Sequence, residues 1–172
     1  MGNGECVDFT NLNRACPKDP FLVPKIDQLV DATCRHPRVS FLDAFQGYHQ
    51  ITLDHEDQEK TSFITLKGNY HYTMMPFRQK NVRAIYQRMV TRMFWDKIEN
   101  KVEVYIDDMV VKSRKEKEHM ANLTKTLKIF RRHKFHLNAN KCAFGVGAGK
   151  LLGHIVSRRG IEVNLNQIKA IQ

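Results

Sequence analysis

The chain has 172 residues, of which 42% are hydrophobic and 27% charged, a composition typical of one folded domain and not of a disordered chain. Its longest apolar runs fall far short of the roughly 18 residues that span a membrane, so we expect no membrane partner. The 28 lysines and arginines outnumber the 18 aspartates and glutamates, which gives a formal net charge of +10. This excess favours a polyanionic partner, most often nucleic acid.

The four cysteines include no Cys-x-x-Cys pair, which argues against a zinc ribbon. Their number is low for a secreted disulfide scaffold, and the N-terminus does not resemble a signal sequence. We therefore expect reduced thiols and a cytoplasmic or nuclear location.

Taken in chain order, the first 37 residues carry four of the five prolines and are interpreted as an irregular arm with short extended pieces. Short apolar runs predict strands at Val39–Leu42 and Ile51–Leu53. Two further runs, Ser62–Thr65 and Tyr70–Met74, flank Lys67-Gly68-Asn69 and predict a hairpin.

From residue 81 the hydrophobic period becomes helical, and it predicts one amphipathic helix over 81–95 and a second over 115–132. Between them, alternation over Val102–Ile106 predicts a half-buried strand, which resumes at Met109–Val111 after Asp107-Asp108. Extended segments are expected last, at 151–156 and 161–163. Strands interleaved with two helices predict an α+β fold, with the helices on one face of a mainly antiparallel sheet and the other face free.

The carboxylates of Asp43 and of Asp107-Asp108 break local rules, because they end or interrupt apolar strands. Adjacent acids about 4 Å apart repel by about 4 kcal/mol at an effective dielectric of about 20, and a divalent cation relieves that repulsion. Three carboxylates at strand ends suit Mg²⁺ with substrate phosphates, in a site for two-metal phosphoryl transfer. Spacing alone leaves open an ordinary polar hairpin turn, since Asp is common in turns.

The residues around these carboxylates resemble known motifs. Tyr105-Ile106-Asp107-Asp108 resembles the Tyr-x-Asp-Asp box of reverse transcriptases, and residues 41–51 (Phe-Leu-Asp-Ala-Phe-Gln-Gly-Tyr-His-Gln-Ile) resemble the catalytic motif that precedes it. Similar segments occur in order along nearly the whole chain, at 7–13, 24–27, 75–77, 141–145 and 152–156. The chain is identified as a member of the reverse transcriptase domains of gypsy-type long-terminal-repeat retrotransposon Pol polyproteins.

This resemblance implies a polymerase right hand. Residues 1–172 would form a single reverse transcriptase domain of partial fingers and palm, with thumb, connection and ribonuclease H missing. Its implied activity is that of an RNA-directed DNA polymerase, which adds dNTPs to the 3′-hydroxyl of a template–primer with two Mg²⁺ ions, or Mn²⁺ in their place. The other Pol domains would be partners in an intact element, within a virus-like particle.

The resemblance also assigns roles to individual residues. The implied metal ligands and catalytic residues are Asp43, Asp107 and Asp108, and Lys141 would protonate the leaving pyrophosphate. Implied nucleotide contacts are Ala44, Phe45, Gly47, Tyr48 and Gln87, with Tyr48 as the aromatic gate that excludes a ribose 2′-hydroxyl. Implied nucleic-acid contacts are Tyr105, Ile106, Leu152, Gly153 and His154, the last three as a primer grip.

For several of these residues the sequence leaves an ordinary alternative open. The open alternatives are a core tyrosine for Tyr48, a surface glutamine for Gln87 and a solvated charge for Lys141. The segment 152–154 fits an ordinary strand with a close-packed glycine.

The chain departs from the family where substrate is held. Arg78 and Arg83 stand where the family has glycine, which permits a positive φ or close approach to substrate. Glu5 stands where the family has an arginine that contacts the triphosphate. These departures predict a truncated or decayed copy, and the alternative function is a catalytically impaired nucleic-acid-binding remnant of the polyprotein.

Overall fold

The computed structural model describes residues 7–95 and 101–162. The chain divides into two compact units. The first unit comprises residues 1–21 and 46–86, and the second comprises residues 22–45 and 87–172. Each unit is described by itself.

A four-stranded antiparallel sheet forms the centre of the second unit, in the order β4-β5-β1-β6. The strands are β1 (Arg38–Asp43), β4 (Val102–Tyr105), β5 (Asp108–Ser113) and β6 (Ala143–Val146). The valines of β4 and the methionine and valines of β5 are almost fully buried.

Helix α5 (His119–Arg132), preceded by the short η3 (Glu116–Glu118), covers one face of this sheet. A hydrogen bond of 2.7 Å between Ser40 Oγ and His119 Nε2 joins the helix to β1. The ring of Phe130 packs on that of Phe94, with centroids 5.0 Å apart.

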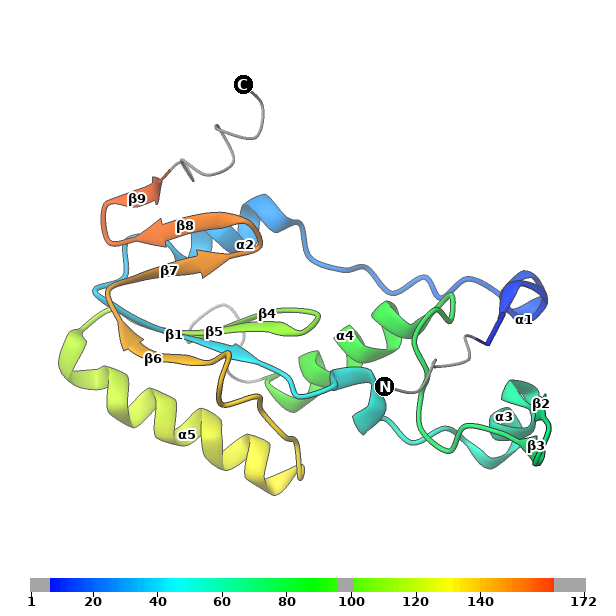
Figure 1. Cartoon of the computed structure of the whole chain (residues 1–172). Coiled ribbons are helices and arrows are strands. Elements are labelled where there is room, and N and C mark those ends of the chain that lie inside the picture. The colour runs from blue at the N-terminus through cyan, green and yellow to red at the C-terminus, as the bar shows by residue number, and fades with distance from the viewer. Residues whose placement is uncertain (1–6, 96–100, 163–172) are drawn as a thin grey trace. The chain divides into compact units, whose positions relative to one another are not determined.

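The opposite face carries helix α2 (Ile26–Thr33) and a smaller antiparallel sheet (Figure 1). That sheet consists of β7 (Ala148–Leu151), β8 (His154–Ser157) and β9 (Gly160–Glu162). One apolar cluster joins these elements to the central sheet: Leu29, Val30, Cys34, Val39, Val110, Leu151 and Val156. Strand β7 lies so close to β1 that a Cβ at Gly149 would be 2.2 Å from the Phe41 ring, so this position requires glycine.

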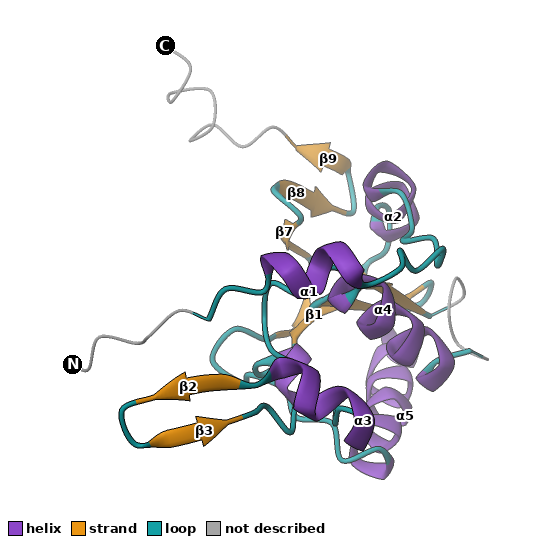
Figure 2. Ribbon diagram, turned by 90° about the vertical axis from the view of Figure 1, so that its right-hand side faces the viewer, coloured by secondary structure: helices purple, strands orange, loops and turns teal. Residues whose placement is uncertain are grey.

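The first unit is built from short elements (Figure 2). They are α1 (Thr10–Ala15), η1 (Gly47–Gln50), α3 (His55–Gln58), η2 (Glu59–Thr61), and the hairpin of β2 (Phe63–Thr65) and β3 (Gly68–Tyr70). The aromatic ring of Tyr72 packs against Phe9 and Phe63, with centroids 6.1 and 5.5 Å away. Helix α4 (Val82–Met93) begins in the first unit and continues into the second.

The α+β fold of antiparallel sheets and helices is confirmed, as are both predicted long helices. A hairpin does follow Ser62, but its turn is Leu66-Lys67 and its second strand is Gly68–Tyr70, so the expected strand at Tyr70–Met74 was wrong. Other expectations were wrong. The proline-rich arm contains α1 and α2, and α2 and the small sheet cover the sheet face expected to be free. Residues 151–156 are not one strand, because they contain the end of β7, a two-residue turn and most of β8. Ile51–Leu53 contributes only an isolated bridge between Thr52 and Met74.

Three sequence-based expectations cannot be compared fully with the structure. Glu5, Val163 and the segment where the thumb would begin (166–172) lie outside the described residues. Within the described ranges, no helix is both long enough and apolar enough to cross a bilayer.

Candidate active site

Two carboxylates meet where β1 ends and β5 begins. The antiparallel register of these strands sets Asp43 directly opposite Asp108. Directly opposed residues of an antiparallel pair project to the same face with Cβ atoms about 5 Å apart. The sheet therefore brings together two acids that are 65 positions apart in the sequence (108 − 43).

The other predicted carboxylate, Asp107, lies in the turn between β4 and β5. Since Tyr105 pairs with Asp108, Ile106 and Asp107 form a two-residue hairpin loop. Ile106 has a φ of 50°, in the left-handed region that a β-branched residue rarely adopts. The Asp107 carbonyl accepts a 3.4 Å hydrogen bond from the Ala44 N–H, which ties the turn to the end of β1.

Gln87 of α4 holds this turn from the side. Its side chain is 1% exposed. Its Nε2 donates to the Val104 carbonyl at 3.0 Å, and its Oε1 accepts from the Ile106 N–H at 2.7 Å. The alternative of a surface glutamine is therefore wrong, because both ends of this amide bind backbone in the interior. Its expected contact with the nucleotide stays a prediction. The periodicity of the predicted helix gave no signal for this buried contact.

A loop after α5 lies against the other side of Asp43. The Asp43 N–H donates to Cys142 Sγ at 3.4 Å, and the Asp43 carbonyl accepts from the Asn138 N–H at 2.9 Å. Lys141 Nζ is 3.9 Å from Asp43 Oδ1. The loop thus places the Lys141 ammonium beside the carboxylate pair. The sequence contained no sign that Cys142 and Asn138 would bind the Asp43 backbone.

The electrostatics of the pair reflect burial and like charge. Burial raises the pKa of Asp108, the nearby Asp43 charge raises it further, and Lys141 acts in the opposite direction. A divalent cation at this point would relieve the repulsion between the two acids.

The three expected metal ligands do not form one preassembled cluster, and their role as ligands stays a prediction. Within the described residues, no three or more His, Cys, Asp and Glu side chains are grouped so as to hold a metal ion. Asp43 and Asp108 face each other, while Asp107 lies in the turn. These oxygen donors still fit Mg²⁺, because this ion usually takes one or two protein carboxylates and completes its shell with water and substrate phosphates.

The other predicted contact residues of the second unit lie in two places, directly after β1 and at the turn between β7 and β8. Ala44 is buried and forms an isolated bridge with Leu137, while Phe45 is half exposed. Leu152 and Gly153, with φ of 49° and 89°, form the two-residue turn between β7 and β8, in which Leu151 pairs with His154. Two positive φ values in such a turn are typical of type I′.

Gly47 and Tyr48 belong to the first unit. Tyr48 is 8% exposed, and its ring packs edge-on against Phe77 and Tyr86, each with centroids 5.3 Å away. This packing is that of a core tyrosine, and its role as a gate stays a prediction.

The two family glycines that are arginines here adopt different backbone conformations. Arg78 has a φ of 72°, so the backbone keeps the left-handed conformation for which glycine is suited. Asn13 stabilises this loop, since its Nδ2 donates to the Arg78 carbonyl at 2.8 Å and its Oδ1 accepts from the Lys80 N–H at 2.7 Å. Arg83 is an exposed residue of the helix α4, without a positive φ.

Comparison with known proteins decides the family. The sequence pattern of "Reverse transcriptase (RNA-dependent DNA polymerase)" matches residues 5–156. The chain belongs to the reverse transcriptase family. It is 34% identical over 166 residues to the retrovirus-related Pol polyprotein from transposon 412 of Drosophila melanogaster, and 31% identical over 166 residues to that from transposon gypsy of the same organism. Each alignment covers 96% of this chain, but the chain spans only 13% and 16% of those polyproteins.

The fold agrees with solved reverse transcriptases. The structure of the foamy viral protease-reverse transcriptase in complex with RNA/DNA hybrid superposes with a TM-score of 0.86 at 19% identity, over 96% of this chain and 22% of that one. A second foamy viral structure, in complex with double-stranded DNA, gives a TM-score of 0.88. The partial palm and fingers architecture of a reverse transcriptase is therefore the fold of this chain.

Proposed function

We propose that this chain is the polymerase domain of a gypsy-type retrotransposon Pol polyprotein and that it adds deoxynucleotides to a primer paired with an RNA or DNA template. The observation that carries the proposal is the register of β1 and β5. It sets Asp43 opposite Asp108 beside the Asp107 turn, in a chain of the reverse transcriptase family. The foamy viral relatives were solved with RNA/DNA hybrid and with double-stranded DNA, which supports the same partners here.

The residues that would hold divalent metal are Asp43, Asp107 and Asp108. Two Mg²⁺ ions bound there would activate the primer 3′-hydroxyl and stabilise the leaving oxygen of the pyrophosphate. The protein supplies the fixed part of this site, because the β1–β5 register holds one carboxylate on each strand and the Gln87 contacts hold the turn.

Lys141 is suited to give a proton to the leaving pyrophosphate. Its ammonium lies beside Asp43, at 3.9 Å from Oδ1, and its side chain is 66% exposed. An exposed lysine held by a single weak ion pair remains available to a phosphate that arrives at the carboxylates.

Other contacts are assigned by position on the elements around the carboxylates. Ala44 and Phe45 follow Asp43 directly and would lie against the incoming nucleotide, with Gly47 and Tyr48 next along the chain. The β7–β8 turn at Leu152-Gly153, with His154 after it, would support the primer end. Tyr105 and Ile106 would contact the primer from the β4–β5 turn.

The chain as a whole is proposed to be one reverse transcriptase domain that acts together with the other domains of a Pol polyprotein. Its location in cytoplasm, nucleus or virus-like particle stays a prediction. The alternative function, a nucleic-acid-binding remnant without catalysis, is not favoured by the family match.

Magnesium-dependent primer extension by the chain tests the proposal. We expect incorporation of dNTPs that EDTA abolishes and that Asp43→Asn or Asp107→Asn lowers at least about 100-fold, since the lost charge stabilisation is several kcal/mol. Asp27→Asn, a matched change at an exposed acid of α2, should leave the rate unchanged. Tight template–primer binding by the native chain without incorporation would instead favour the remnant.

A further inference from the structure

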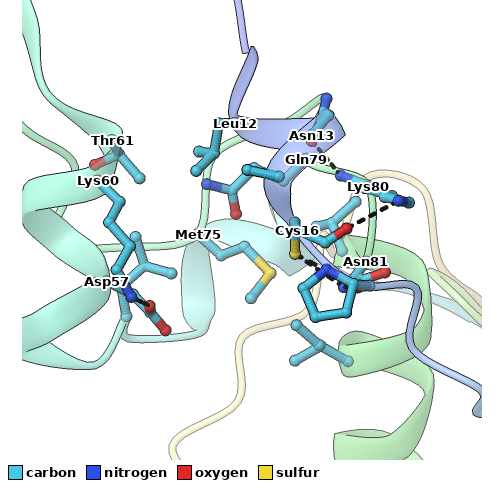
Figure 3. Close-up of a pocket in the computed structure, with 15 residues that line it drawn as sticks. Leu12, Asn13, Cys16, Asp57, Lys60, Thr61, Met75, Gln79, Lys80 and Asn81 are labelled. Atoms are coloured by element: carbon cyan, nitrogen blue, oxygen red, sulfur yellow. Dashed lines mark hydrogen bonds and ion pairs between the residues drawn. The ribbon is translucent and has the colours of Figure 1, made fainter. Parts of the chain in front are cut away.

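The first unit contains a cavity of about 440 Å³ that has no part in the proposed polymerase chemistry. Its walls come from α1 and the residues just after it, from α3 and η2, and from the loop that leads into α4 (Figure 3). Most of the wall is apolar and consists of Leu12, Ala15, Pro17, Leu53, Met75, Val82 and Ile85. The volume is within the range of small-molecule sites, about 300–1,000 Å³.

Hydrogen bonds fix the walls of this cavity. Asn13 joins α1 to the loop before α4 through the Arg78 carbonyl and the Lys80 N–H. Asn81 Nδ2 donates to the Pro17 carbonyl at 2.7 Å, which joins the same two segments a second time. Because the walls are cross-linked without a ligand, little ordering cost remains to be met on binding.

The cations in the wall already have partners. Lys60 Nζ forms an ion pair with Asp57 Oδ1 at 2.8 Å. Lys80 Nζ donates to the Cys16 carbonyl at 2.8 Å. Neither lysine therefore requires an anionic ligand, and an uncharged ligand fits the apolar wall.

Gln79 supplies the polar group that a ligand would meet. Its side chain is half buried, and Figure 3 shows the carboxamide pointing into the cavity between Leu12 and Met75. None of the other described residues forms a hydrogen bond with this carboxamide. A carboxamide offers N–H donors beside a carbonyl acceptor, so its complement has an N–H beside a C=O.

We propose that this cavity binds an uncharged planar heterocycle with a lactam edge. The lactam N–H would donate to Gln79 Oε1 and the lactam carbonyl would accept from Nε2, while the ring packs on Leu12 and Met75. Paired hydrogen bonds of this kind are how glutamine recognises base edges in nucleic acids. The heterocycle is therefore either an unpaired base of a nucleic acid strand or a free small molecule.

The probe for the shared chemistry is 2-quinolone, titrated into the full chain with ¹³C-labelled methionine methyl groups. We expect the Met75 methyl signal to shift with saturation. N-methyl-2-quinolone, which lacks the N–H donor, should bind about three- to tenfold more weakly, the usual effect of one hydrogen bond. Equal affinity of the two quinolones for the native chain, or no shift at Met75, would overturn the proposal.

Variants at Gln79 assign the effect to its carboxamide. Gln79→Leu should abolish the preference for 2-quinolone over its N-methyl form. Gln79→Glu keeps the side-chain shape and should weaken 2-quinolone binding, because a carboxylate repels the lactam carbonyl. Gln28→Leu, the same change at an exposed residue of α2, should leave the preference intact. Native chemical-shift dispersion in each variant shows that it is folded, and a folded Gln79→Leu chain that retains the preference would contradict the assignment.

A second titration distinguishes the two sources and needs no polymerase activity. If the ligand is an unpaired base, the trinucleotide dT₃ should shift the Met75 methyl signal and its N3-methylated form should not. If only the free quinolone shifts that signal, the ligand is a small heterocycle. A shift with both trinucleotides would mean that phosphates and not the lactam edge drive binding, which is against the proposal.

Discussion

The side chain of Gln87 spans the turn that carries Asp107, accepting from the Ile106 N–H and donating to the Val104 carbonyl. The turn needs this support, because Ile106 has a φ of 50° and strained conformations persist only where the surroundings fix them. Helix α4 therefore fixes the backbone on which a proposed metal ligand is mounted. Gln87 acts through the turn and is a positioning residue.

Gln87→Leu should destabilise the protein and impair primer extension. The change leaves the Ile106 N–H and Val104 carbonyl without their partner in the interior, at a cost of about 1–3 kcal/mol for each group. Urea unfolding measures the loss, and extension under conditions where the variant is folded should still be slower than native. Gln87→Glu retains an acceptor for the Ile106 N–H, so it should recover part of the lost stability and part of the lost extension rate. An unfolding midpoint equal to native for Gln87→Leu would refute the role of these contacts.

Arg78→Gly should stabilise the protein by about 0.5–1 kcal/mol. A side chain in the left-handed region costs about 1–2 kcal/mol, and the greater freedom of glycine in the unfolded chain offsets part of that gain. Arg83→Gly is the matched control, since the same change in the helix α4 should destabilise by up to about 1 kcal/mol. Unfolding free energies of the two variants should thus change in opposite directions; a loss of stability in both would contradict the prediction.

Much of the second unit could be predicted from periodicity and motifs. The helical periodicity predicted α5, with a start about one turn before the observed one. The alternation on both sides of Asp107-Asp108 predicted the two strands β4 and β5. The neighbourhood of Asp43 and Asp108 followed from the resemblance, and the register of β1 with β5 agrees with it. In the first unit, the positive φ of Arg78 is one of the two backbone properties that a family glycine at this position implies.

What could not be predicted depends on tertiary packing. Helix α2 has only eight residues between prolines, so the spacing of Leu29, Val30 and Thr33 was too short a signal. The second face of the central sheet is covered because Leu151 of β7 and Val156 of β8 pack against it. The hydrophobic pattern of these short strands does not show which surface of the domain they contact. Likewise, no sequence period tells whether the amide of a glutamine on a helix faces solvent or a buried turn.

The buried ion pair of Lys112 and Glu103 should be sensitive to loss of either partner. Their side chains are 5% and 8% exposed, and Lys112 Nζ also donates to the Ala32 carbonyl at 3.0 Å. Lys112→Met leaves the Glu103 charge buried and unpaired, which should cost about 3–5 kcal/mol. The double change Lys112→Met with Glu103→Leu should recover much of that loss. A double-mutant cycle by denaturant unfolding checks this, and additive effects of the two changes would show that the pair is not coupled.

The stability of the second unit should fall as the pH drops below about 6.5, because of His119. This buried residue lies between Ser40 Oγ and Ser113 Oγ, 2.7 and 3.0 Å from its ring nitrogens. Burial lowers the pKa of His119, and the charge of Arg38 lowers it further. The unfolded chain therefore binds a proton more readily than the folded one.

Stability from His119 is thus fully present above its unfolded pKa of about 6.5 and is lost as the pH falls through the lower folded value. Within that window the loss is at most about 1.4 kcal/mol per pH unit. Urea unfolding at pH 7.5, 6 and 5 measures it, and His119→Gln should flatten the pH dependence while lowering stability at pH 7.5. His133→Gln, at an exposed histidine after α5, should retain the native slope. A slope unchanged by His119→Gln would assign the acid sensitivity to other groups.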